Sequence, residues 1–123
     1  MKRKIARLLI PLAVVTASLG IFAAPAQAGA DFTVTVGSES CWLYGYYLQP
    51  AEARVRATSC HKAQARVRYI TVGGSFTYSY GPEVYLGYVS LATAGTSMVT
   101  ERAGRGAIIE GGTYWSSYKS YIA

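Results

Sequence analysis

Residues 52–80, EARVRATSCHKAQARVRYITVGGSFTYSY, alternate between small apolar side chains and polar or aromatic ones with a period of two residues. The alternation runs through residues 52–58, resumes over 63–72 and returns over 75–80, after the turn-forming pair Gly73-Gly74. Side chains two positions apart share one face of a β-strand, whereas a helix repeats every 3.6 residues. The stretch therefore predicts three strands and an all-β fold.

The rest of the chain after residue 30 carries the same signal and no sustained helical stripe. Gly45 is expected to mark a bulge or a point of close approach inside a strand. About eight short strands with turn signals between them indicate a small antiparallel β-sandwich or barrel, and the pattern does not choose between the two. The further strands are expected over residues 31–36, 41–48, 83–93, 96–102 and 107–110, and the last segment, residues 113–122, is rich in tyrosine and serine.

Residues 1–28 have the three parts of a signal peptide. Basic residues at positions 2–7 precede an apolar run over residues 8–24, and Ala26-Gln27-Ala28 is a small-residue cleavage site. We expect cleavage after Ala28, secretion of residues 29–123 as a single domain, and no stable membrane insertion afterwards. The alternative is an uncleaved anchor, whose apolar run is interrupted by proline and glycine.

The basic excess of the chain belongs largely to this leader. The chain has 12 Lys and Arg against 6 Asp and Glu, and four of the basic residues lie within residues 1–28, so the mature domain has a net charge of +2. Domains that bind nucleic acid carry a much stronger basic excess. We therefore expect no nucleic-acid partner.

Cys41 and Cys60 are the two cysteines of the chain. Exported proteins meet an oxidising environment, so we expect a disulfide between them, with two buried free thiols as the alternative. Closing a loop of this length stabilises a fold by about 3 kcal/mol.

The mature domain has two pairs of arginines at polar positions, Arg54 with Arg56 and Arg66 with Arg68. A hairpin that turns near His61 would place Arg54 opposite Arg68, and the same register would place Arg56 opposite Arg66. Four guanidinium groups on one face repel one another, so they need carboxylates, tyrosine rings to stack on, or an anionic partner. Two interpretations remain: a salt-bridged or solvated strand face, and a binding patch for an acidic partner.

Aromatic residues are unusually frequent, with 11 Tyr and 2 Trp in the chain. Tyr and Trp offer large, rigid contact areas with a polar tip, which suits protein interfaces and the stacking of sugar rings. The alternative is that they divide between core positions and ordinary cross-strand pairs. Two aromatic clusters stand out, one over residues 42–47 and one made of Tyr114 and Trp115 with Tyr118 and Tyr121. The candidate binding residues are the four arginines with Trp42, Tyr44, Tyr46, Tyr47, Tyr114 and Trp115.

No catalytic, metal or cofactor motif is present. His61 is the only histidine, no nucleophile elbow or phosphate-binding loop occurs, and the six carboxylates are scattered along the chain. A glycosidase-like carboxylate pair has no motif in its favour. We expect no metal, no cofactor and no enzymatic activity.

The signal peptide and the C-x18-C pair resemble those of small exported proteins of actinomycete type. In outline, residues 41–44 and 61–67 are also similar to the secreted α-amylase inhibitors, a family of six-stranded β-sandwiches closed by disulfides. That family presents a Trp-Arg-Tyr triplet on a hairpin. The triplet and a second cysteine pair are absent here, so no functional residue is carried over from the resemblance.

Three functions follow as hypotheses. The first is a secreted non-enzymatic binding module, inhibitor or effector that holds a protein or glycan through exposed Tyr and Trp and an arginine-lined strand face. The second is a structural or cell-envelope protein that associates with copies of itself. The third is a small hydrolase, which needs a cleft with two close carboxylates.

Overall fold

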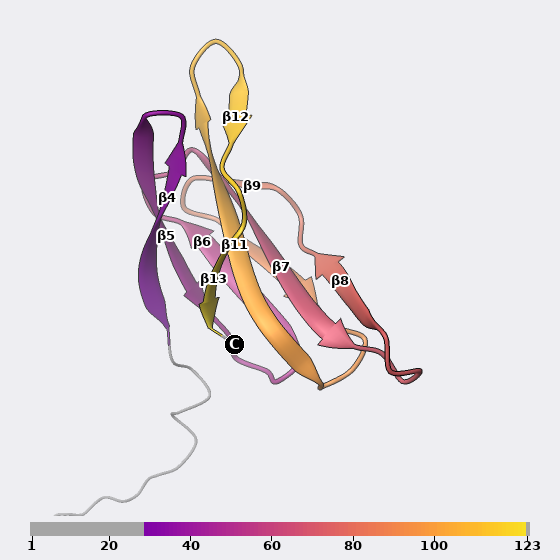
Figure 1. Cartoon of the computed structure of the whole chain (residues 1–123). Coiled ribbons are helices and arrows are strands. Elements are labelled where there is room, and N and C mark those ends of the chain that lie inside the picture. Colours follow the sequence, from indigo (N-terminus) through magenta and orange to yellow (C-terminus); the bar gives the residue numbers. More distant parts are fainter. Residues whose placement is uncertain (1–28, 123) are drawn as a thin grey trace, which may run out of the picture.

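The computed structural model describes residues 29–122 and contains two antiparallel sheets packed face to face (Figure 1). The predicted signal peptide, residues 1–28, lies outside the described residues. The first sheet has the spatial order β10 (Val89–Thr93), β6 (Glu52–Ala57), β5 (Glu39–Tyr46) and β4 (Ala30–Val36). The second has the order β12 (Thr113–Trp115), β11 (Val99–Ile109), β7 (Lys62–Ile70) and β8 (Phe76–Tyr80).

Two short strands complete the edges of the second sheet. β9 (Val84–Tyr85) pairs with β7 beyond the end of β8, and β13 (Lys119–Ile122) pairs with β11 beyond the end of β12. The all-β prediction is confirmed, and the layered arrangement of two sheets is that of a sandwich. Within residues 29–122 there is no helix long and apolar enough to cross a membrane.

The core lies between the sheets and is built largely from small side chains. Alternate residues of β6 and β7 point into it, and Val55 and Val67 have no exposed surface. Leu43 from β5 is equally buried. Burial of one face of each strand follows directly from the period-two pattern.

The connection from β6 to β7 differs from the predicted hairpin. β6 belongs to the first sheet and β7 to the second, so the chain crosses from one layer to the other between them. The crossing is fixed because the backbone N–H groups of Thr58, Ser59 and Cys60 donate to the carbonyl of Trp42. Cys60 is fully buried and forms the predicted disulfide with Cys41 on the inner face of β5.

β11 is one continuous strand, and the prediction of two strands separated at Gly104 is wrong. Gly104 and Gly106 lie inside it because the opposite sheet approaches their backbone closely. A Cβ on Gly106 would lie 2.5 Å from the Cys60 sulfur, and one on Gly104 would lie 2.8 Å from a methyl group of Val55. Gly45 marks a similar close approach, to the ring of Tyr121, and no bulge.

The strand predicted over residues 83–93 is in fact two strands in different sheets. β9 ends at Tyr85, and the chain turns through Gly87, whose φ of 88° favours glycine, before β10 starts at Val89. Ser90 then ties the two sheets together, because its hydroxyl donates to the carbonyl of Pro82 and accepts from the N–H of Ala65. Alternation alone did not reveal this turn.

Candidate binding surface

The four candidate arginines lie on opposite sides of the sandwich. Arg54 and Arg56 are on β6 in the first sheet, whereas Arg66 and Arg68 are on β7 in the second. In both strands the neighbouring residues point into the core, so each pair lies on the outer face of its own sheet. The predicted single patch of four arginines is therefore wrong, because the crossing at Cys60 separates its two halves.

The outer face of the second sheet brings aromatic and basic side chains together. Aromatic residues come from the two edges of this sheet, and basic residues come from its two central strands. We call this surface the aromatic–basic face. It comprises Lys62, Arg66, Arg68, Phe76, Tyr78, Tyr80, Tyr85, Arg105, Trp115 and Tyr118.

Cations and rings alternate across this face in one uninterrupted series. Arg66 lies between two rings, 4.6 Å from the centroid of Tyr78 and 4.4 Å from that of Tyr118. Each such contact contributes about 0.5–2 kcal/mol, depending on how far the pair is removed from water. The full series is Tyr78, Arg66, Tyr118, Arg105, Trp115, Lys62 and Tyr85, with Arg68 over Phe76 beside it.

Two carboxylates offset part of the positive charge. Glu101 accepts from the hydroxyl of Ser120 and from Arg66 at 2.7 Å, and these contacts lower the pKa of Glu101 although burial opposes them. Glu83 lies 3.2 Å from Lys62 and 3.8 Å from Arg105. The face therefore carries four basic and two acidic side chains, a net excess of two positive charges.

Side chains on this face form a packed layer above the sheet. Ala103 and Ala107 point outward from β11, yet both have no exposed surface. The ring of Tyr118 reaches β7, where its hydroxyl donates to Gln64 at 2.9 Å, and burial raises the pKa of that hydroxyl. Arg105 donates to the same Gln64 oxygen through two nitrogens. The cations are thus held in defined positions by contacts within the domain.

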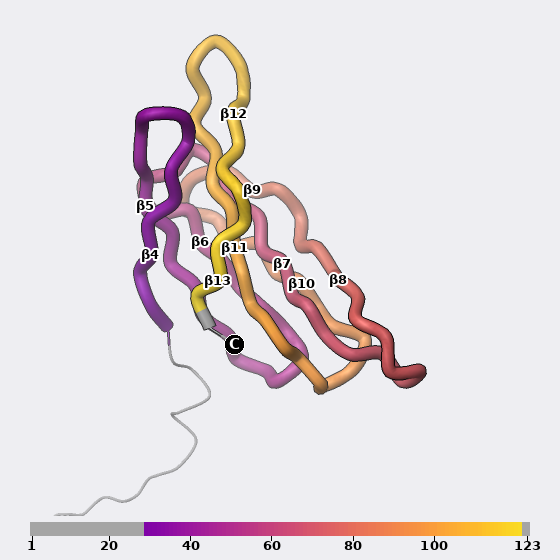
Figure 2. Tube along the Cα trace, viewed as in Figure 1, coloured from indigo at the N-terminus to yellow at the C-terminus, as the bar shows by residue number. Residues whose placement is uncertain are grey.

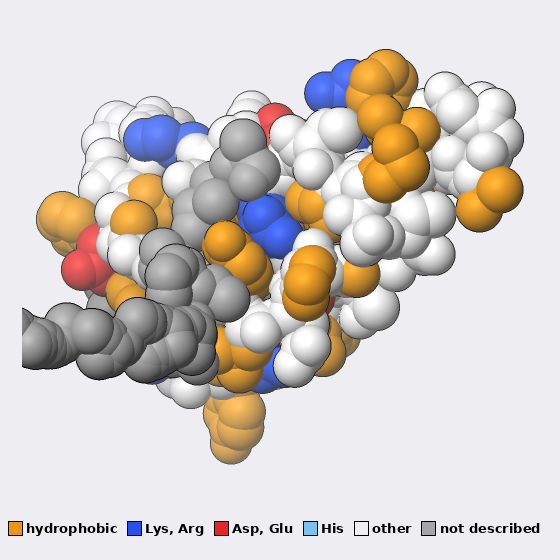
Figure 3. All heavy atoms as spheres, turned by 90° about the horizontal axis from the view of Figure 1, so that it is seen from below, with side chains coloured by type: hydrophobic (Ala, Val, Ile, Leu, Met, Phe, Trp, Pro, Cys, Tyr) orange, Lys and Arg blue, Asp and Glu red, His pale blue; other side chains and the backbone are white. Residues whose placement is uncertain are grey.

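The rings at the edge of the second sheet remain open to solvent. Phe76, Tyr78, Tyr80 and Tyr85 are exposed by 57%, 45%, 55% and 62%. Figure 3 shows basic side chains lying among hydrophobic ones on the surface seen from below. Large rings exposed side by side on a small domain are typical of an interaction surface.

The outer face of the first sheet is a second, smaller aromatic surface. Trp42 is exposed by 52%, the rings of Tyr44 and Tyr46 lie 5.4 Å apart, and Arg56 lies 5.1 Å from the ring of Tyr44. Arg54 differs, because it pairs with a buried carboxylate at 2.6 Å.

That carboxylate belongs to Glu52, and it organises the loop that follows β5. Burial raises the pKa of Glu52, but hydrogen bonds from Arg54 and from the backbone of Leu48 outweigh this and lower it. In the same loop the ring of Tyr47 lies 3.8 Å from the buried guanidinium of Arg102. Arg54 and Tyr47, both predicted binding residues, therefore have partners within the domain.

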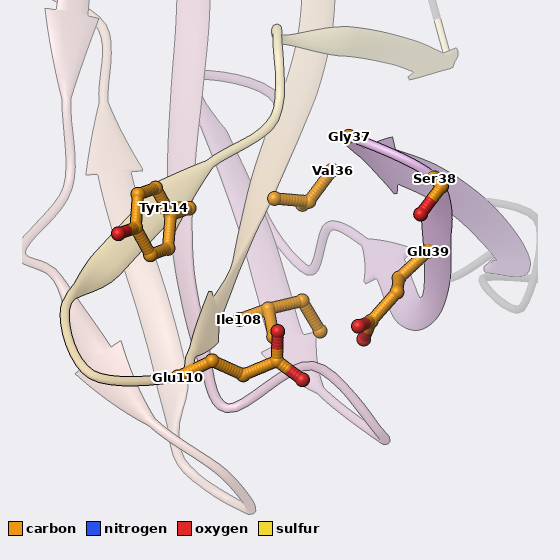
Figure 4. A pocket seen from close by; sticks show the side chains of 7 residues that line it. All are labelled: Val36, Gly37, Ser38, Glu39, Ile108, Glu110 and Tyr114. Carbon is orange, nitrogen blue, oxygen red and sulfur yellow. The ribbon is translucent and has the colours of Figure 1, made fainter.

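Tyr114 lies apart from the aromatic–basic face, at one end of the sandwich. The turn between β4 and β5 and the hairpin between β11 and β12 both project there (Figure 2). Between them is a hollow of about 290 Å³ lined by Tyr114, Ile108, Glu39 and Glu110 (Figure 4). A hydrogen bond with Glu110 and the negative charge of Glu110 raise the pKa of Glu39.

This carboxylate pair was not expected from the sequence, because its members are 71 positions apart in a chain without a motif around either. Both side chains are exposed, whereas a catalytic acid is normally tuned by burial. His61 is nearby but its Nδ1 accepts from the backbone N–H of Ile109. Within residues 29–122, no three His, Cys, Asp or Glu side chains come close enough to hold a metal ion.

Several members of the aromatic–basic face were not among the predicted binding residues. Lys62 and Arg105 join it only because β7 and β11 lie side by side, whereas Tyr118 belongs to the second aromatic cluster that the sequence singled out. The rings of β8 could have been predicted to share one face, since aromatic residues alternate with hydroxyl residues directly after the Gly73-Gly74 turn. Comparisons of the chain with models of known protein families, with curated proteins and with solved structures give no match.

Proposed function

We propose that the mature domain is a secreted, non-enzymatic binding module that holds its partner on the aromatic–basic face. The observation that carries the proposal is the set of half-exposed rings on β8 and β9 beside cations that are already fixed in place. These rings contribute little to the core. Exposing them to water has a free-energy cost that an interaction partner would remove.

The chemistry of the face favours an acidic glycan as the partner. Sugar rings stack on exposed aromatic side chains, and the excess of two positive charges attracts carboxylate, sulfate or phosphate groups. The basic side chains are held by rings and by Glu83 and Glu101, so little side-chain entropy is lost on binding. A protein partner would use the same rings, and the experiment below separates the two.

The test is retention of the purified domain on insoluble polysaccharides and on immobilised secreted proteins, at low and at high salt. We expect retention on acidic polysaccharides that weakens with salt, because screening reduces the contribution of the cations. Retention only on a protein would replace the glycan as the partner. A lack of retention on every material would refute the binding-module proposal.

Two matched variants locate the surface. Tyr80 and Tyr114 are exposed by 55% and 57%, but only Tyr80 lies on the aromatic–basic face. Tyr80→Ala is expected to weaken binding about tenfold, the usual effect of losing one central aromatic contact. Tyr114→Ala is expected to bind like the unmodified domain. The reverse result would move the site to the hollow beside Glu39 and Glu110.

A further inference from the structure

The outer edge of β8 is an open strand edge. β8 pairs with β7 on one side, and no other strand within residues 29–122 pairs with it. Two backbone hydrogen bonds flank the β7–β8 ladder: the N–H of Gly81 donates to the carbonyl of Ala65, and the N–H of Thr71 donates to the carbonyl of Ser75. Hydrogen-bonded and non-hydrogen-bonded pairs alternate along an antiparallel ladder. The backbone groups of Phe76, Tyr78 and Tyr80 therefore point away from β7.

The other sheet edges in the described part of the chain are protected. Lys119 reaches across to the edge of β4, where its Nζ donates to the carbonyl of Thr33 at 2.9 Å. The edge of β10 is covered by Gly81, because a Cβ there would lie 2.7 Å from the carbonyl oxygen of Leu91. The edge formed by β12 and β13 is interrupted over residues 116–118. Charges, breaks and coverage of this kind are how proteins prevent strand pairing.

β8 has no charge or break of this kind, and β10 of the first sheet lies near it without pairing to it. Its sequence, FTYSY, contains no charge, proline or glycine. It is also self-complementary, because aromatic and hydroxyl residues alternate symmetrically about Tyr78. In an antiparallel pair of two such strands, Tyr78 would face Tyr78, Phe76 would face Tyr80, and Thr77 would face Ser79. Aromatic pairs and hydroxyl pairs are both favourable between neighbouring strands.

We propose that β8 is a self-association edge, along which a second copy of this chain adds its own β8 in antiparallel register centred on Tyr78. The three outward-pointing residues of each strand would then exchange backbone hydrogen bonds with those of the second copy. A two-fold arrangement of this kind is self-complementary and closed, so it gives dimers and not fibres.

The dimer would place two aromatic–basic faces side by side on one continuous sheet. One five-residue strand from each copy buries less than the roughly 800 Å² per partner of a standard interface. We therefore expect weak association in free solution. On a repetitive polymer the local concentration is high, and the paired faces would bind with greater avidity than one face alone.

Cysteine variants test the register directly, with residues 29–123 as the material because the described core lies wholly within this segment. Directly paired residues lie about 5.5 Å apart at their Cα atoms, within the range that a disulfide spans. Tyr78→Cys should therefore form a dimer linked between chains under mild oxidation. Phe76→Cys should not, because its two copies would be displaced by about 14 Å along the strands.

Sedimentation velocity over a range of concentrations tests the equilibrium. We expect a dimer fraction that rises with concentration, and a dissociation constant at least tenfold higher for Tyr78→Pro, which removes an outward N–H without removing a bond to β7. Equal cross-linking of Tyr78→Cys and Phe76→Cys would overturn the proposal. A protein that is monomeric at every concentration would also overturn it. The edge could then pair only with an extended peptide from another protein. Ligand binding by the face is tested separately by a Tyr85→Ala variant, because Tyr85 lies on β9, outside the pairing edge.

Discussion

Tyr118 is the residue at which the energetics of the aromatic–basic face can be measured. Its ring contacts Arg66 at 4.4 Å and Arg105 at 5.1 Å, and its hydroxyl donates to Gln64. A partly buried cation–ring contact contributes about 1 kcal/mol, and a neutral hydrogen bond contributes a similar amount. Tyr118→Leu removes all three interactions and should lower the free energy of unfolding by about 3 kcal/mol.

Tyr118→Phe is the matched variant, because it keeps the ring and loses only the hydroxyl. The Gln64 oxygen still accepts from Arg105 at 2.7 Å, so it is not left without a donor. We expect a loss of about 1 kcal/mol. Tyr114→Leu, at an exposed ring on the opposite side of β12 from Trp115, should change stability by less than about 0.5 kcal/mol.

Urea unfolding at neutral pH, followed by far-ultraviolet circular dichroism, measures these differences, provided that the m-value stays constant. The Leu variant should regain part of its stability in high salt, because salt screens the repulsion between Arg66 and Arg105 that the ring no longer offsets. Equal losses for Tyr118→Leu and Tyr118→Phe would refute the reasoning, since the contacts between cations and the ring would then contribute nothing.

Three further predictions concern the fold that supports this face. Replacing Cys41 and Cys60 together by serine should lower stability by about 3 kcal/mol, measured by urea unfolding, while binding to the partner persists. Gly106→Ala should cost about 1–3 kcal/mol because its Cβ would meet the disulfide, whereas Gly112→Ala should be neutral or slightly stabilising. The pKa of Glu101 is lower in the folded protein than its ordinary value of 4.5, so its contribution to stability is present above that pH and is lost as the pH falls through the folded pKa. Glu101→Gln should therefore flatten the loss of stability below about pH 4.5 in thermal unfolding scans.

The strands were largely predictable because alternation is a local property, but their assignment to sheets was not. The alternating pattern of residues 52–58 and 63–72 is compatible both with a hairpin and with two strands that face each other across the core. The burial of Cys60 decides between the two, because it makes the connection from β6 to β7 cross from one sheet to the other. Gly104 was predicted to end a strand because a glycine in a sequence usually indicates a turn. Its actual role is to allow close packing, which depends on a residue of the opposite sheet that the sequence does not identify.

Repulsion between the arginines was expected to require carboxylates, stacked rings or an anionic partner. The structure supplies the first two, although not on one shared face: Arg66 pairs with Glu101 and lies between two tyrosines, while Arg56 and Arg68 each lie over one ring. What the sequence could not give was the source of these partners. Glu101, which pairs with Arg66, lies on β11 and is 35 positions further along the chain.

In the proposed binding site, the exposed rings should contribute more to affinity than the guanidinium groups. The guanidinium groups of Arg66 and Arg105 are already engaged by carboxylate, amide and rings, so a ligand gains less from them than from solvated cations. The rings on β8 and β9 keep one open face, and an incoming partner can bury that surface without breaking an existing contact. Aromatic substitutions should therefore reduce affinity for every partner, whereas changes in charge should mainly alter the preference for acidic over neutral ones.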